Sequence, residues 1–274
     1  MAEHSIQLIN LVGTENRACK GFLNLMRNYF LMLYSAIIVG GSVIVFGFPL
    51  FILGLLMPLL FAYSPNQGRV PPMGPSLRRA WARFVLWAHR VQIEIDGPGL
   101  DNLKDGQARI MVSNHQSALD IFVNSATLPK KIFFMAKKEL FWIPIFGLAA
   151  WMAGTIYVDR KKGRRDREAF NGISRSLANA NSIFIYPEGT RSKDGKLLAF
   201  KRGAFILAIE YQAEILPVTI LNSNELMPKG SLYLKSGIVK VWVDKPVSTR
   251  GMTGEDRYRL CELVQNQIAK NLDR

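Results

Sequence analysis

The chain has 274 residues, a formal net charge of +14 at pH 7 and a sequence pI near 9.9, and 49% of its residues are hydrophobic. This length allows one large domain or two small ones, with a sizeable core. Nucleic acid and an anionic membrane both attract so basic a chain, but the high apolar content favours the membrane, and we expect no nucleic-acid partner.

The cysteines indicate the compartment. Cys19 and Cys261 lie near opposite ends of the chain, without the paired spacing of a disulfide framework or a metal site. A reducing compartment is therefore expected.

Residues 1–28 read as a weakly amphipathic lead-in whose apolar and basic positions favour a place near a membrane surface. Acidic and polar residues occur in it, and no clear small-residue cleavage pattern follows the next apolar run. A retained anchor is therefore favoured over a secretory signal peptide.

An apolar run of 35 residues extends from Tyr29 to Tyr63, and no charged residue lies between Arg27 and Arg69. This run is longer than the roughly 20 residues that cross a bilayer core as one helix. Pro49, near its middle, lacks a backbone donor and disfavours helix at the residue before it. We therefore expect two shorter helices of about 15 residues each, too short for an easy full crossing.

Basic residues flank this run on both sides, so both of its ends are expected on the cytoplasmic side. The preferred arrangement for residues 1–63 is a membrane-embedded, re-entrant helical hairpin. A single crossing is the alternative. A buried helical hairpin in a soluble core fits so long an uncharged stretch less well.

Residues 64–90 are predicted to form a linker and an interfacial helix. Proline and glycine are frequent from Ser64 to Pro75, which indicates the linker. The segment from Pro75 to Arg90 combines aromatic residues with four arginines and reads as a helix, which lies along lipid head groups or docks on the following domain.

Strands and helices alternate over residues 91–274, which predicts an α/β layer domain. Strands are expected at 91–96, 109–113, 132–136, 154–158, 182–186, 215–221 and 238–243. Helices are expected at 118–126, 145–150, 165–179, 203–211 and 254–272.

One histidine and one aspartate stand out at the turn after the strand 109–113. If Ser117 caps the next helix, Asp120 in its first turn points back to the loop that carries His115. An aspartate that accepts from one imidazole nitrogen leaves the other nitrogen free as a base near neutral pH. On spacing alone the alternative stands, in which Asp120 merely suits the helix start and His115 is an ordinary loop residue.

Charged residues also follow other predicted strands, where α/β sheets present their sites. Glu188, Gly189 and Arg191 follow the strand 182–186, and the planar fork of Arg191 suits phosphate. Arg160 closes the segment from Gly154, and Lys137 adjoins an aromatic, apolar surface. Taken singly, the segment with Glu188 and Arg191 is more typical of an ordinary turn, and the charged run at Arg160 of a solvated face. Lys137 fits an ordinary surface lysine equally well.

Taken together, Asn114-His115-x-x-x-x-Asp120, Gly154 to Arg160, Tyr186 to Ser192 and Leu216-Pro217-Val218 resemble the glycerophospholipid acyltransferase family in order and spacing. The resemblance covers roughly residues 90–245 and is greatest to the 1-acylglycerol-3-phosphate acyltransferase branch. Tyr186 stands where the family often has phenylalanine, a conservative change. The resemblance implies a mixed-sheet α/β acyltransferase domain over residues 91–274.

The resemblance also implies the chemistry. His115 would take a proton from the free hydroxyl of 1-acylglycerol 3-phosphate (lysophosphatidic acid) as it attacks an acyl thioester, and Asp120 would orient the imidazole. The product is phosphatidic acid. The donor would be acyl-CoA or acyl carrier protein as co-substrate, with no metal or other cofactor.

The same resemblance implies how the acceptor is held. Lys137, Arg160 and Arg191 would hold its phosphate, and the segment of Glu188, Gly189 and Thr190 would shape its site. A phospholipid membrane is the expected partner, and the active site is expected on the cytoplasmic face of a membrane, the bacterial inner membrane being the favoured one.

Three alternatives stay open. In the first, the chain catalyses the same reaction, but the acceptor is glycerol 3-phosphate or another lysophospholipid. In a different class, the protein is a non-catalytic membrane lipid-binding protein in which His115 and Asp120 are structural. An acyl-ester hydrolase is disfavoured because no Gly-x-Ser-x-Gly segment occurs.

Overall fold

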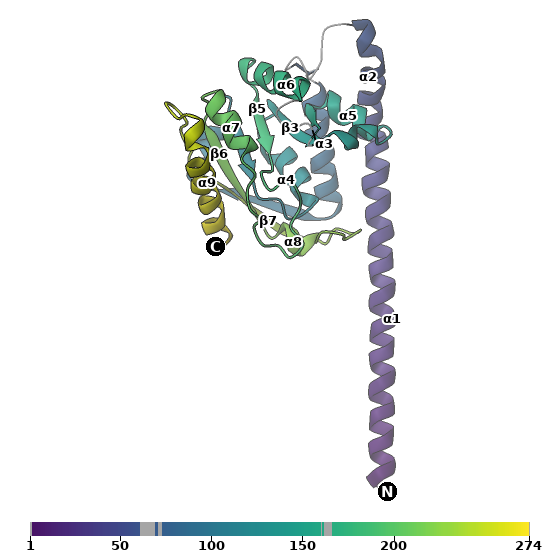
Figure 1. Ribbon diagram of the computed structural model, residues 1–274. Helices are drawn as coiled ribbons and strands as arrows, with labels where there is room; N and C mark the ends of the chain where they lie inside the picture. The colour runs from purple at the N-terminus through teal and green to yellow at the C-terminus, as the bar shows by residue number, and fades with distance from the viewer. Residues whose placement is uncertain (1, 61–68, 71–72, 160, 162–165, 274) are drawn as a thin grey trace.

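The structure is a computed structural model that describes residues 2–60, 69–70, 73–159, 161 and 166–273. A long N-terminal helical rod lies at one side of an α/β body, and the body packs against part of the rod's length (Figure 1).

A seven-stranded sheet forms the centre of the body, in the order β1-β7-β6-β2-β5-β3-β4. Only β6 and β7 pair antiparallel, and all other neighbouring strands are parallel, so the sheet is mixed as the resemblance implied. The strands are β1 Val91–Asp96, β2 Ile110–Ser113, β3 Ile132–Lys137, β4 Thr155–Val158, β5 Ser182–Ile185, β6 Ile215–Leu221 and β7 Gly237–Val243.

Helices cover both faces of the sheet (Figure 1). The α-helices of the body are α3 Met73–Ala88, α4 Leu119–Thr127, α5 Phe146–Met152, α6 Arg167–Ala178, α7 Gly203–Glu210, α8 Ser223–Leu226 and α9 Arg257–Leu272. The 3-10 helices are η3 Leu100–Leu103, η4 Lys138–Trp142 and η6 Gly254–Asp256.

The alternation of side chains along β5 divides the core into two layers. Ile183 and Ile185 belong to the cluster formed with α6, α7 and α9, whereas Phe184 belongs to the cluster formed with α3 and α4. Every residue of β2 and β5 is buried, as expected for central parallel strands covered on both faces.

The predicted strands are confirmed, each with bounds within one residue of those expected. The predicted helices are also present, although the one expected at 254–272 is divided into η6 and α9. Helix α8 was not predicted, because four residues carry too little periodicity to identify a helix.

The hairpin expected around Pro49 is wrong. Helix α1 (Ala2–Ser42), the π-helical segment η1 (Val43–Gly47) and helix α2 (Phe48–Leu60) continue in one direction as a single rod (Figure 1). Pro49 lies inside this rod, and the π-helical turn Val43–Gly47 directly before α2 accommodates the hydrogen bonding altered by its missing amide. Within the described residues, Lys20–Leu56 is one helical stretch long and apolar enough to cross a membrane.

One face of the rod docks on α3 and its neighbours through polar contacts, one exposed, one partly buried and one buried. The hydroxyl of Tyr34 donates to the carbonyl of Ala88 at 2.6 Å, and the indole Nε1 of Trp81 donates to Ser42 Oγ at 2.8 Å. Ser35 Oγ accepts from the amide of Leu234 at 3.2 Å. The opposite face exposes large apolar side chains, among them Ile37, Ile44, Val45, Phe48, Ile52 and Leu55, so the rod is no buried core helix.

Most of the predicted linker from Ser64 to Pro75 lies outside the described residues. The helix predicted after the linker is α3. It was expected either along lipid head groups or on the following domain, and in the structure it docks on the α/β body. Ala82, Val85 and Leu86 are buried there, while Trp87 remains exposed.

Candidate active site

The carboxyl ends of β2, β5 and β3 lie side by side at one edge of the sheet, because these strands are parallel neighbours. The loops that leave this edge carry His115 after β2, the segment from Tyr186 to Arg191 after β5, and Lys137 at the end of β3. Residues far apart in the sequence are therefore brought to one place.

His115 and Asp120 meet at this edge. His115 Nδ1 lies 2.9 Å from Asp120 Oδ2, and the same oxygen accepts from the amides of Gln116 and Ser117, each at 2.9 Å. Asp120 is fully buried and His115 is 14% exposed. An aspartate held by three donors fixes the proton on Nδ1 and leaves Nε2 as the acceptor nitrogen of the ring.

Ser117 ties this loop into the fold. Its Oγ accepts from the amide of Leu119 at 3.0 Å and donates to the carbonyl of Met227 at 2.6 Å. Both the lone pair and the proton of this hydroxyl are therefore used in the turn that starts α4.

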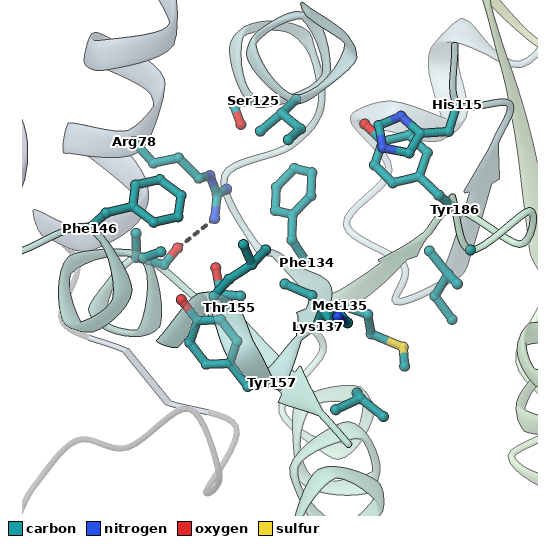
Figure 2. Close-up of a pocket in the computed structure, with 18 of the residues that line it drawn as sticks. Arg78, His115, Ser125, Phe134, Met135, Lys137, Phe146, Thr155, Tyr157 and Tyr186 are labelled. Atoms are coloured by element: carbon teal, nitrogen blue, oxygen red, sulfur yellow. Dashed lines mark hydrogen bonds between the residues drawn. The ribbon is translucent and has the colours of Figure 1, made fainter. Parts of the chain in front are cut away.

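Tyr186 supports the imidazole from its face. The two rings stack with centroids 3.8 Å apart and an angle of 15° between their planes, and Figure 2 shows them overlapping. The phenol oxygen accepts from Asn124 Nδ2 at 2.9 Å. Burial raises the pKa of the Tyr186 hydroxyl well above its ordinary value, so the phenol stays neutral.

Glu188 lies beneath the site and is only 2% exposed. Its Oε1 accepts from the amide of His115 at 2.6 Å and its Oε2 from the amide of Leu198 at 2.9 Å. Burial raises the pKa of this carboxyl to about 7, although both amide hydrogen bonds favour the ionised form. Glu188 is absent from the cavity wall described next, and its contact with His115 is through the backbone amide.

A cavity of about 710 Å³ opens beside His115. Figure 2 shows His115 and Tyr186 on one side of it and Arg78 and Phe146 on the other. Its wall is mostly apolar and includes Val43, Phe46 and Leu50 of the N-terminal rod. A cavity of this size and composition suits an apolar ligand with a polar end.

Among the predicted site residues, His115, Lys137, Gly189, Thr190 and Arg191 line this cavity. Lys137 Nζ lies 3.3 Å from Glu139 Oε1, both side chains being exposed. Arg160 lies outside the described residues.

Two cationic residues of the cavity wall were missed by the sequence analysis, Arg78 and Lys201. Arg78 Nη1 donates to the carbonyls of Ile132 at 3.1 Å and Ala153 at 2.6 Å, and burial lowers its pKa to about 9. In the sequence, nothing distinguishes Arg78 from the other arginines of α3, or Lys201 from the other lysines of the loop before α7. Only the fold shows that these two line the cavity.

Similarity to known proteins covers most of the chain. The Acyltransferase family profile matches residues 94–221. The human protein 1-acyl-sn-glycerol-3-phosphate acyltransferase alpha is 30% identical over 223 residues, which cover 81% of this chain and 76% of the human protein. The chloroplastic 1-acyl-sn-glycerol-3-phosphate acyltransferase LPAT1 of Arabidopsis thaliana is 34% identical over 200 residues, covering 72% of this chain and 53% of the plant protein.

A solved structure has the same fold. The crystal structure of PlsC, the 1-acyl-sn-glycerophosphate (LPA) acyltransferase of Thermotoga maritima, superposes with a TM-score of 0.71 over 90% of this chain and 95% of that chain. The sequence identity is 24%, so the likeness concerns the fold.

Proposed function

The chain belongs to the 1-acyl-sn-glycerol-3-phosphate acyltransferase family and is an O-acyltransferase, and we propose that it acylates the free sn-2 hydroxyl of 1-acylglycerol 3-phosphate to give phosphatidic acid. The observation that carries this proposal is the contact of 2.9 Å between His115 Nδ1 and Asp120 Oδ2 beside a largely apolar cavity.

In the proposed reaction, Nε2 of His115 takes the proton of the acceptor hydroxyl while the oxygen attacks the carbonyl carbon of the acyl thioester. The tetrahedral intermediate collapses with cleavage of the carbon–sulfur bond, and the imidazolium returns the proton to the leaving thiolate. Asp120 stabilises the imidazolium and holds the ring. The acceptor's own hydroxyl is the nucleophile, so no acyl-enzyme forms. The resemblance to the family implies in addition that no metal or other cofactor takes part.

Arg191 and Lys137 are proposed to hold the phosphate of the acceptor, because both line the cavity with His115. Arg160 is assigned the same role from the sequence alone. Gly189 and Thr190 border the acceptor, and Glu188 shapes the site through the amides it holds. The donor is acyl-CoA or acyl carrier protein, whose carriers are anionic and suited to the basic chain.

The N-terminal rod supports a site at a membrane. Its exposed apolar face offers an attachment to lipid, and its residues Val43, Phe46 and Leu50 also line the cavity. A lipid acceptor then passes from the bilayer to the site without crossing water. We propose that the active site lies on the cytoplasmic face of a membrane and that this membrane is the bacterial inner membrane.

The test is an assay of the purified protein with acyl-CoA and acyl carrier protein donors against lysophosphatidic acid, glycerol 3-phosphate and other lysophospholipids. Phosphatidic acid is expected as the main product. His115→Ala should lower turnover by about 10²–10⁴-fold, and Asp120→Asn by a large factor within the same range, with unchanged circular dichroism.

Two results would contradict the proposal. Undiminished turnover by folded His115→Ala would exclude the general base. Binding of lysophosphatidic acid without any product, from either donor, would favour a lipid-binding protein in which the pair is structural.

A further inference from the structure

The cavity wall has an uneven charge. Among the residues that line it, four are cationic, Arg78, Lys137, Arg191 and Lys201, and none is acidic. So much unbalanced positive charge beside a general base indicates an anionic ligand.

Two of the four cations are already engaged within the protein. Arg78 donates to main-chain carbonyls, and Lys137 is paired with Glu139. Arg191 and Lys201 have no acidic partner in the part of the chain that the structure describes. These two are therefore the cations of the wall whose charge is not balanced by an acidic side chain there, whereas the charge of Lys137, also assigned to the phosphate, is balanced by the exposed Glu139.

Lys201 occupies a place that Gly189 leaves vacant. Gly189 has a φ of +70°, and a Cβ built on it would lie 2.9 Å from Lys201 Nζ. A side chain at position 189 would therefore displace the ammonium group, whereas glycine lets it lie across the loop that carries Arg191.

The backbone around Lys201 is tied to that same loop. The amide of Lys201 donates to the carbonyl of Pro187 at 2.9 Å, and the amide of Leu198 donates to Glu188 Oε2 at 2.9 Å. The amide of Phe200 is bound by Gln265 Oε1 at 3.1 Å. Although its side chain is exposed, the backbone of Lys201 is therefore fixed against the segment from Pro187 to Gly189, which leads to Arg191.

We infer that Lys201 binds the second negative charge of a phosphate monoester held by Arg191, and so selects a monoester acceptor over a phosphodiester. This inference rests on the proposed function and names how its acceptor is chosen. A phosphate monoester carries about −1.5 to −2 charges at pH 7, whereas a diester carries one. Because Glu139 balances the charge of Lys137, the guanidinium of Arg191 neutralises a diester, and a monoester leaves a second charge for the ammonium group of Lys201.

The probes are lysophosphatidic acid and its phosphomethyl ester, which has the same acyl chain and one charge fewer. For Lys201→Gln, the KM for lysophosphatidic acid should rise about tenfold, with kcat and the KM of the thioester donor within about twofold of the unmodified protein. The KM for the methyl ester should change by less than about twofold. Lys201→Arg should keep most of the preference because it keeps the charge.

Lys193→Gln is the matched control, since Lys193 is an exposed lysine of the same loop that does not line the cavity. It should behave as the unmodified protein. Equal losses on both acceptors, an unchanged KM for lysophosphatidic acid, or a rise confined to the donor's KM would each overturn the inference. Failure of the unmodified protein to acylate lysophosphatidic acid would instead refute the proposed function, so the two failures are distinguishable.

Discussion

The imidazole of His115 stacks on the phenol ring of Tyr186, with ring centroids 3.8 Å apart and planes 15° from parallel. Asp120 holds one edge of the imidazole and Tyr186 covers one face, so the ring has a single orientation with Nε2 as its remaining nitrogen. In the proposed reaction, a base held in this way would lose little freedom when the acceptor binds.

Tyr186 is therefore expected to act through its ring. Tyr186→Phe keeps the stack and should retain most of kcat, while losing about 1 kcal/mol of stability because Asn124 Nδ2 loses its acceptor. Tyr186→Ala should lower kcat by at least about tenfold, since the imidazole is no longer held. Steady-state kinetics with thermal melts distinguish the two variants, and equal activity of both would show that the stack has no part in catalysis.

Ser117 is expected to be structural. Ser117→Ala removes one buried hydrogen bond, from the amide of Leu119, and one partly buried hydrogen bond, to the carbonyl of Met227, and should cost about 1–2 kcal/mol of unfolding free energy. Most turnover should remain, because the general base and the acceptor hydroxyl are untouched. Denaturant unfolding and initial rates measure both effects. Complete loss of turnover in a folded variant would indicate a serine nucleophile and contradict the proposed mechanism.

Arg191 is expected to bind the acceptor's phosphate. Arg191→Ala should raise the KM for lysophosphatidic acid by about tenfold or more, because a charge-assisted hydrogen bond is lost. A monoacylglycerol, which has the hydroxyl but no phosphate, should be affected much less. Rates on both acceptors at one donor concentration provide the measurement, and equal losses on the two would exclude phosphate binding by Arg191.

Glu188 should make stability depend on pH. Burial raises its pKa from 4.5 to about 7, so between these pH values the folded protein holds a proton that the unfolded chain has released. The free energy of unfolding should therefore fall as pH rises from about 4.5 to about 7, by about 3 kcal/mol at most. Above pH 7 both states are ionised at this residue, and the contribution is constant.

Glu188→Gln provides the comparison. The amide cannot titrate, so the difference in melting temperature between the unmodified protein and the variant should change across this window and level off above it. The variant should also lose activity. Its side-chain carboxamide has a single acceptor oxygen, which can accept from the backbone amide of His115 or from that of Leu198, but the remaining side-chain nitrogen cannot accept from the other. A difference that does not vary from pH 5 to pH 8 would refute the assignment of this titration to Glu188.

Much of the fold follows from local pattern. The strands from Val91 to Val243 were predicted to within one residue, because apolar runs bounded by turn residues are local signals. The direction of the chain at Pro49 was predicted wrongly, as a reversal. A proline forbids one hydrogen bond but does not decide whether the chain turns, and here η1 and the contacts of the rod with α3 keep one helix.

The sequence by itself identified His115, Asp120, Glu188 and Arg191 as a set, because their spacing resembles a known family. The contact between His115 and Asp120 was expected from their spacing, whereas the tertiary structure alone decided what surrounds that pair. In the folded protein, Glu188 accepts hydrogen bonds from two backbone amides, and Tyr186 stacks on the imidazole of His115. Arg78 and Lys201 join the cavity wall. Spacing along a chain fixes which residues belong to one turn, whereas contacts between turns depend on the order of parallel strands and on the packing of helices around them.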